Sequence, residues 1–111
     1  MRQFVIDELS PMERDNIDSY LKRTIKQGPM IGLYWLQVPE DLLSATQLEH
    51  KEQHGPYHLG VELTNTAVTF ELLVRSQFNL HCHCIAHATA AQRQFVLDFI
   101  DKMTEEEFIK S

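Results

Sequence analysis

Residues 57–75, with the sequence YHLGVELTNTAVTFELLVR, decide the expected fold of this chain. Apolar and polar side chains alternate along the stretch, which predicts two strands with one buried face. A two-residue turn at Thr64-Asn65 would place six apolar side chains on that face. The expected pairs are Val61 with Val68, Leu59 with Phe70, and Tyr57 with Leu72. On the opposite face, the same register pairs His58 with Glu71.

Capping sequences predict one helix before this hairpin and another after it. Ser10-Pro11-Met12-Glu13 opens the first helix with a capping box, and Gly28-Pro29 is expected to end it. Thr89-Ala90-Ala91-Gln92 opens the second helix, whose apolar residues recur at helical spacing as far as Met103. A short terminal helix is expected to begin at Thr104.

Two further strands are expected at Met30–Val38 and Phe78–Ala86, and residues 39–54 carry a weaker helical pattern. A three-residue loop after the hairpin would place Phe70 beside Cys82 and Glu71 beside His81. Together these elements predict one α+β domain over residues 1–111. Its expected architecture is a two-layer sandwich, a four-stranded antiparallel sheet with the N- and C-terminal helices packed on one face.

The composition is that of a small acidic domain. The 111 residues include 10 basic and 16 acidic side chains, so the formal charge is −6. No nucleic-acid partner is expected, because phosphate contacts need clustered lysines and arginines. No membrane association is expected either, because the longest nearly apolar run, Met30–Leu36, is far shorter than the ~20 residues of a spanning helix. Phe4-Val5-Ile6 is too short for a signal sequence, so we expect a cytoplasmic protein with free thiols.

All six histidines lie between positions 50 and 87, and four residues form the candidate site. With the registers above, His58, Glu71, His81 and His83 would share one side of the sheet. Imidazoles with a carboxylate are ligands that zinc, nickel, cobalt or ferrous iron accept. A solvated polar face, or a hydrogen-bonded network around Glu71, would produce the same pattern without a metal.

The remaining thiols and histidines favour structural roles. Alternation through Phe78–Ala86 sends Cys82 and Cys84 to the apolar face, where small core residues are expected. His50 and His54 lie four residues apart in the weak helix, where we expect an exposed polar face.

Three functions are compatible with the sequence, which identifies no cofactor, ligand or catalytic residue. The first is a non-enzymatic homodimeric interaction or regulatory module, because Trp35 or Tyr34 would join Leu73 and Ile85 in an apolar patch. Residues 39–56 would either cover this patch or leave it open. The second is a transition-metal-binding protein or small metalloenzyme that uses the four-residue cluster. The third is pH sensing, since protonation of six histidines would bring the formal charge of −6 to zero.

Overall fold

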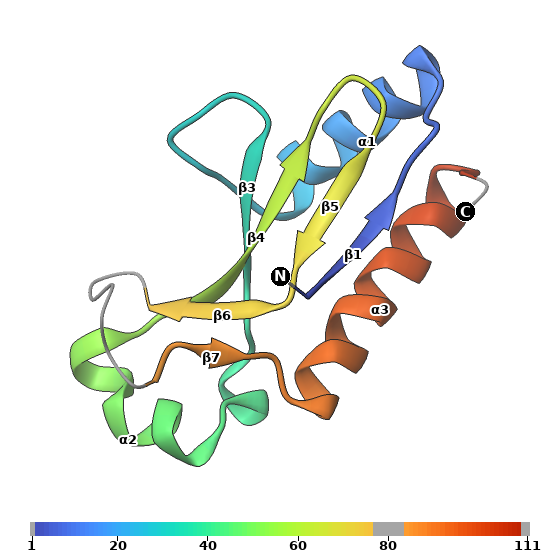
Figure 1. The fold of residues 1–111 in the computed structure, drawn as a ribbon. Helices are drawn as coiled ribbons and strands as arrows, with labels where there is room; N and C mark the ends of the chain where they lie inside the picture. The colour runs from blue at the N-terminus through green and yellow to red at the C-terminus, as the bar shows by residue number, and fades with distance from the viewer. Residues whose placement is uncertain (1, 77–83, 110–111) are drawn as a thin grey trace.

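Strand pairing organises the chain around one mostly antiparallel sheet (Figure 1). The computed structural model describes residues 2–76 and 84–109. Over these ranges there are three helices: α1 (Pro11–Thr24), α2 (Ala45–His54) and α3 (Ala90–Glu106), with a 3-10 segment η1 (Glu40–Leu42) before α2. The strands are β1 (Gln3–Ile6), β2 (Lys26–Gln27), β3 (Leu33–Gln37), β4 (Tyr57–Leu63), β5 (Val68–Glu71), β6 (Leu73–Ser76) and β7 (Ala86–His87).

The α+β class is confirmed, but the prediction of a four-stranded sheet is wrong. In the described part of the chain, the main strand order is β1-β5-β4-β3-β2, and β6 pairs with both β4 and β7. The strand β1 was not predicted. It has only four residues, and its pairing with β5, from Gln3–Glu71 to Ile6–Val68, stabilises it. Isolated two-stranded pairs are marginal, so such a short strand depends on its tertiary neighbours.

The hairpin is formed by β4 and β5, with a register two residues away from the predicted one. Val61 pairs with Phe70, and Leu63 pairs with Val68. The loop is longer than the predicted two-residue turn, and within it the backbone N–H of Thr64 donates to the Ala67 carbonyl at 2.8 Å. An even shift keeps every side chain on its predicted face, because strand side chains repeat every two residues. All six apolar residues of the predicted pairs are therefore buried.

The second hairpin strand changes partners at Leu72. Its N–H donates to the Arg2 carbonyl at 2.9 Å, and its carbonyl accepts from the Ala88 N–H at 2.9 Å. Beyond Leu72, the strand β6 rejoins β4, with Arg75 opposite His58. The partners of Phe70 and Arg75 on β4 are Val61 and His58. Two more residues lie between Phe70 and Arg75 than between these partners, and the extra residues form a bulge in the strand. The bulge brings Arg75, instead of the predicted Glu71, beside His58.

Only the end of the strand predicted at Phe78–Ala86 can be compared with the structure, because residues 77–83 lie outside the described ranges. Within the described part, Cys84 is in a turn and β7 begins only at Ala86, so the end of the predicted strand is wrong. The predicted place of that strand is occupied by β1, which pairs Phe4 with Phe70. Each edge of β5 is thereby filled, one by β4 and the other by β1.

The first helix begins as predicted and ends earlier than predicted. Ser10 and Glu13 form the reciprocal capping box, with Pro11 in the first turn. The helix α1 stops at Thr24 instead of Gly28, because Lys26 and Gln27 extend to pair with β3. The helix α3 extends further than predicted. Thr104, which was expected to begin a separate terminal helix, lies inside α3, and its hydroxyl donates to the Asp101 carbonyl.

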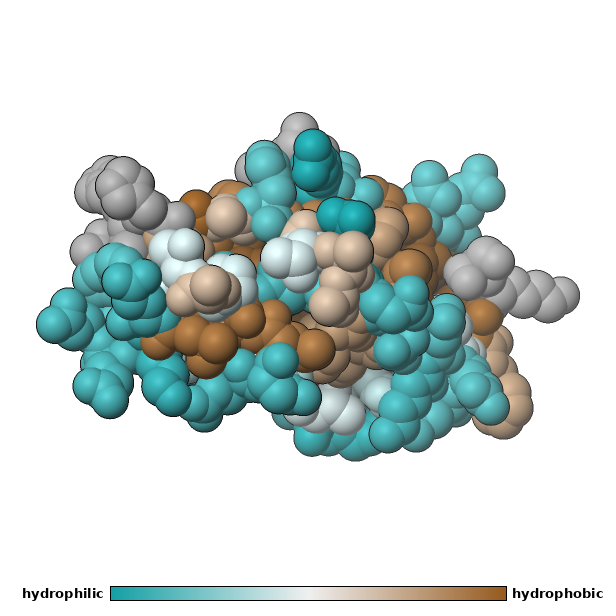
Figure 2. Space-filling view, turned by 90° about the horizontal axis from the view of Figure 1, so that it is seen from below, coloured by the Kyte–Doolittle hydropathy of each residue, from teal (hydrophilic) through white to brown (hydrophobic). Residues whose placement is uncertain are grey.

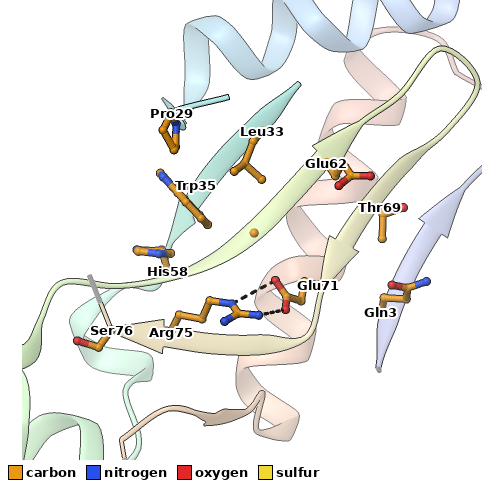
Figure 3. Close-up of a pocket in the computed structure, with 11 residues that line it drawn as sticks. Gln3, Pro29, Leu33, Trp35, His58, Glu62, Thr69, Glu71, Arg75 and Ser76 are labelled. Carbon is orange, nitrogen blue, oxygen red and sulfur yellow. Dashed lines mark hydrogen bonds and ion pairs between the residues drawn. The ribbon is translucent and has the colours of Figure 1, made fainter. Parts of the chain in front are cut away.

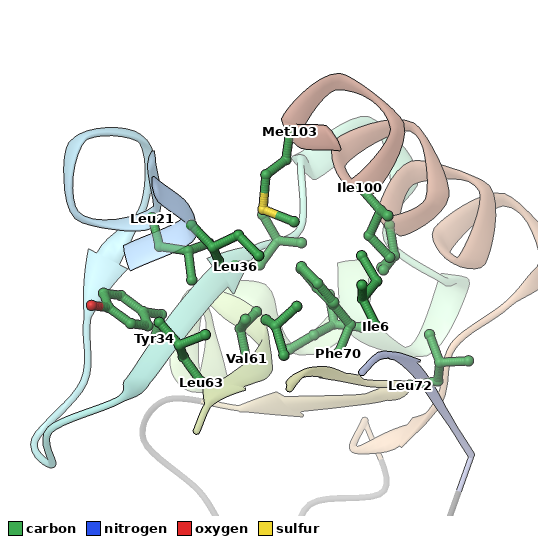
Figure 4. Packing of buried hydrophobic residues seen from close by; sticks show 14 of the residues in the cluster. Ile6, Leu21, Tyr34, Leu36, Val61, Leu63, Phe70, Leu72, Ile100 and Met103 are labelled. Atoms are coloured by element: carbon green, nitrogen blue, oxygen red, sulfur yellow. The ribbon is translucent and has the colours of Figure 1, made fainter. Parts of the chain in front are cut away.

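Helices α1 and α3 share one core with the sheet (Figure 4). Ile17 and Leu21 of α1 are fully buried, as are Val96 and Met103 of α3. An aromatic chain joins the layers, because the ring of Phe99 lies 5.8 Å from Tyr20 and 6.0 Å from Phe70. No helix in the described ranges is long and apolar enough to cross a membrane.

Two buried glutamines connect the start of α2 to the start of α3. The helix predicted from Pro39 is instead η1 followed by α2, and Gln47 completes a capping box with Ser44. Gln92 completes the predicted capping box of α3, and its amide also donates to Gln47 Oε1 and to the Leu42 carbonyl, both at 2.9 Å. The amide of Gln47 donates onward to the Cys84 carbonyl at 3.1 Å. Both glutamines are at most 1% exposed, so these hydrogen bonds are shielded from water.

Replacing Gln92 with Ala is expected to destabilise the protein strongly. The change removes the donor of the Leu42 carbonyl and the acceptor of the Thr89 N–H, and it also removes the hydrogen bond that Gln47 Oε1 accepts in the core. We expect the free energy of unfolding to fall by about 2–4 kcal/mol. Chemical denaturation of the variant will measure this loss. The control is Gln94→Ala on the exposed side of α3, which should change stability by less than about 0.5 kcal/mol. Equal effects of the two substitutions would contradict a structural role for the buried glutamine pair.

Candidate functional site

A hollow of about 760 Å³ lies on the side of the sheet opposite α1 and α3, which we call the outer face (Figure 3). Side chains from five strands line it, since β1, β3, β4, β5 and β6 all contribute. None of residues 39–56 lines the hollow, so α2 leaves this part of the sheet open. In Figure 1, α1 lies behind β4 and β5, and α3 runs beside β1 at the right of the view.

Alternation along β4 explains why polar groups collect here. Tyr57, Leu59, Val61 and Leu63 point into the core and are at most 5% exposed. The intervening residues His58, Gly60 and Glu62 therefore face the hollow. Neighbouring strands follow the same rule, and they contribute Trp35 from β3, Thr69 and Glu71 from β5, and Arg75 from β6.

An ion pair crosses the floor of the hollow. Arg75 Nη2 lies 2.5 Å from Glu71 Oε1, and Arg75 Nε lies 3.4 Å from Glu71 Oε2 (Figure 3). The carboxylate reaches over Gly60, where an added Cβ would lie only 2.9 Å from Glu71 Oε2. The missing side chain at Gly60 thus makes room for the carboxylate. Because Arg75 neutralises it, the Glu71 charge costs less to shield from water than an unpaired carboxylate would.

The aromatic wall of the hollow is formed by Trp35 and His58. Their ring centroids lie 4.3 Å apart with an interplanar angle of 42°, and His58 is 9% exposed. Burial is the main cause that lowers the pKa of His58 below its ordinary value of 6.5, and the charges of Arg75 and Lys26 lower it further. The nearby Glu71 carboxylate acts in the opposite direction without reversing the shift. His58 is therefore a neutral imidazole at neutral pH.

The predicted metal cluster is only partly represented in the described ranges. His58 and Glu71 both line the hollow, whereas His81 and His83 lie outside the described residues. The predicted pairing of His58 with Glu71 is wrong, because Arg75 lies opposite His58. The strand positions predicted for His81 and His83 beside Glu71 and Thr69 are occupied by Gln3 and Val5 of β1. Over residues 2–76 and 84–109, no three His, Cys, Asp or Glu residues are placed to hold a metal ion.

A second histidine group lies away from the hollow. Cys84 is buried, as predicted, and Cys82 lies outside the described residues. The Cys84 sulfur lies 3.7 Å from His54 Nδ1, and the His54 ring stacks on His50 at 5.2 Å. These two histidines are half-buried, so the prediction of an exposed polar helix face is wrong for them. The sequence could not place the thiol beside the imidazole, because 30 residues separate them along the chain.

Trp35 and Arg75 are the principal lining residues that the sequence analysis did not assign to the site. Trp35 or Tyr34 was expected in an apolar patch, and the structure places Trp35 on the outer face and buries Tyr34. Arg75 was expected at the end of the hairpin stretch and was not placed beside His58, because the bulge at Leu72 was not foreseen. The alternate positions 58, 60 and 62 indicated the side of β4 that faces away from the core, but they gave no information on Trp35 or Arg75.

Comparison with known proteins gives no relative for this arrangement. No protein-family model, no curated protein and no solved structure matches the chain. The function must therefore be inferred from the geometry of the outer face.

The lowered pKa of His58 predicts a specific pH dependence of stability. The unfolded chain binds a proton at His58 below about pH 6.5, while the folded protein resists protonation until a lower pH. The contribution of His58 to the unfolding free energy is therefore constant above this range and decreases as pH falls through it. Denaturation curves between about pH 7.5 and pH 5.5 should show this decrease, and His58→Gln should remove it.

The control for this experiment is His87→Gln, which changes an exposed histidine on β7. Its pH dependence should match that of the unmodified protein. A His58→Gln variant that retains the full decrease would show that the slope arises at other groups.

Proposed function

We propose that this protein is a non-enzymatic homodimeric interaction module whose outer face is the contact surface. The observation that carries the proposal is charge balance. Two cations, Lys26 and Arg75, and two carboxylates, Glu62 and Glu71, line the hollow and the small pocket beside it, so their charges sum to zero. The whole chain carries a formal charge of −6.

Charge balance on one face favours a second copy of the chain as the partner. Two molecules of equal negative charge repel each other over most of their surfaces. A face with no net charge can meet itself with little repulsion, and a two-fold dimer brings identical patches together. Apolar area for such a contact is available from Leu33 and Trp35, which are both half-buried at the hollow.

A second apolar area, at the end of the molecule that carries α2, is less suited to be the dimer contact. Figure 2 views the end of the molecule that points down in Figure 1, and it shows hydrophobic atoms between polar areas. Elements at this end contribute Leu42, Leu43 and Phe95, and these partly buried side chains pack against the core cluster. Their remaining exposure therefore lies at the border of the core, whereas Trp35 and Leu33 lie in an open hollow.

The dimer is expected to weaken when a like charge is added to the outer face. Thr69→Glu gives each copy an additional negative charge at the hollow, so the dissociation constant should rise at least about tenfold. Light scattering over a dilution series should give twice 12.9 kDa for the unmodified protein and a lower average mass for the variant. Added salt should strengthen the unmodified dimer, because it screens the repulsion between two acidic copies.

The matched control is Ser19→Glu, which places the same charge on the exposed side of α1. This helix lies on the other side of the sheet, so the variant should dimerise like the unmodified protein. A monomeric unmodified protein at every concentration would refute the proposal, as would equal weakening by both substitutions.

A transition-metal site is the second proposal, and it uses His58, Glu71, His81 and His83. It is supported by the shared position of His58 and Glu71 at the hollow and by the neutral state of the His58 imidazole, since a metal binds the deprotonated ring. The ion pair of Glu71 with Arg75 opposes it, because a metal would have to compete with the guanidinium.

Zinc addition to protein purified without a histidine tag tests this second proposal. If the site forms, zinc will raise the melting temperature, because a ligand that binds only the folded state stabilises it. The increase should be absent in His58→Gln and present in His87→Gln, whose histidine lies outside the proposed set. Absence of both co-purified metal and a zinc-dependent increase would exclude the site.

A further inference from the structure

The loop between β2 and β3 carries the most exposed apolar side chain in the described part of the chain. Ile31 is 96% exposed, and the preceding Met30 is 69% exposed. We call these two residues the loop tip. A side chain with this exposure makes almost no contact within its own molecule, so its apolar surface is available to pack against another molecule.

Backbone hydrogen bonds hold the loop tip in one conformation. The Gly28 N–H donates to the Leu33 carbonyl at 2.7 Å, and the Leu33 N–H donates to the Met30 carbonyl at 3.1 Å. The Gly32 carbonyl accepts from the Leu63 N–H of β4 at 2.7 Å. Gly32 has a φ of +84°, and an added Cβ would lie 2.6 Å from the Leu63 carbonyl oxygen. The loop is thus built to present two apolar side chains with little conformational entropy left to lose.

The loop tip is flanked in the sequence by two residues of the hollow. Pro29, immediately before the tip, and Leu33, two residues after it, both line the hollow (Figure 3). The exposed loop tip and the hollow are therefore neighbours on the molecular surface. Around a two-fold axis between them, the loop tip of each copy faces the hollow of the other.

We propose that, in the homodimer, the loop tip of each copy occupies the hollow of its partner. Ile31 would pack against Trp35 and Leu33 of the other copy, where the neighbouring imidazole of His58 is neutral and the Glu71 charge is paired with Arg75. The inference rests on the proposed homodimer and adds the reciprocal contact that would hold it together.

Charge argues against a membrane as the occupant of the loop tip. Surface-bound loops combine apolar tips with clustered basic residues that attract anionic lipids. Here the nearest basic residue in the sequence is Lys26, and the chain as a whole carries −6. A second copy offers instead an apolar wall at a charge-balanced face.

The first test is a substitution at the loop tip. Ile31→Asp should convert the dimer to a monomer in light scattering, because it would bring a carboxylate to the apolar wall of the partner. The matched control is Met12→Asp, since Met12 is 73% exposed on α1, on the other side of the sheet, and this variant should stay dimeric. Ile31→Ser serves as a second variant without added charge, and circular dichroism should show that all variants keep the native fold.

The second test is complementation, and it uses the fact that Trp35 is the only tryptophan of the chain. Trp35→Ala protein has an intact loop tip and no tryptophan, whereas Ile31→Asp protein has an intact hollow and a defective tip. When the two are mixed, the intact tip should enter the intact hollow and shift the Trp35 emission to shorter wavelength. Partner protein that carries both Trp35→Ala and Ile31→Asp is also free of tryptophan, and it should leave the emission unchanged.

The outcomes separate this inference from the proposed function. A dimeric unmodified protein whose mass is unaffected by Ile31→Asp and Ile31→Ser would overturn the loop-tip contact and leave the homodimer in place. An emission that fails to shift in the complementation mixture would also overturn the contact. A strictly monomeric unmodified protein would overturn both.

Discussion

The structure depends on the alternation of side chains along the central strand β4. This strand pairs with β3 on one edge and with β5 and β6 on the other, so it organises the greater part of the sheet. Its odd-numbered residues, from Tyr57 to Leu63, form the middle of the core beneath α1 and α3. Its even-numbered residues form the floor of the hollow. One strand therefore contributes both to the core of the fold and to the surface proposed as the contact site, because successive side chains must point in opposite directions.

The bulge at Leu72 determines which groups meet on that floor. An uninterrupted strand after β5 would have continued the register of the hairpin past His58. Leu72 instead bonds to Arg2 and Ala88, and the chain returns to β4 with Arg75 opposite His58. The guanidinium can then hold the Glu71 carboxylate over Gly60. The outer face consequently has paired charges beside an aromatic wall, a combination suited to contact with another protein surface.

Local signals in the sequence predicted much of the fold. The capping boxes that begin α1 and α3 were predicted residue by residue, because they depend on side chains within one helical turn. The bounds of β4 and the buried faces of the hairpin were also predicted, since alternation is a local property. The missed features, β1, the bulge and the early end of α1, each require a pairing with a distant segment. Of the candidate site, the sequence identified His58 and Glu71 as residues of the outer face and missed Trp35 and Arg75 as their neighbours.

The sequence by itself determined on which side of the hairpin strands β4 and β5 a side chain lies, because that depends only on the two-residue period of an extended backbone. It also determined the acidic charge of −6 and the apolar residues of the loop tip. Only the tertiary structure decided which side chains are neighbours. Pairing β1 with β5 excluded the predicted neighbours of Glu71, and the bulge placed Arg75 beside His58. Strand register is set by loop lengths and by competition between segments for the same edge, and neither is encoded in the alternation pattern of a single strand.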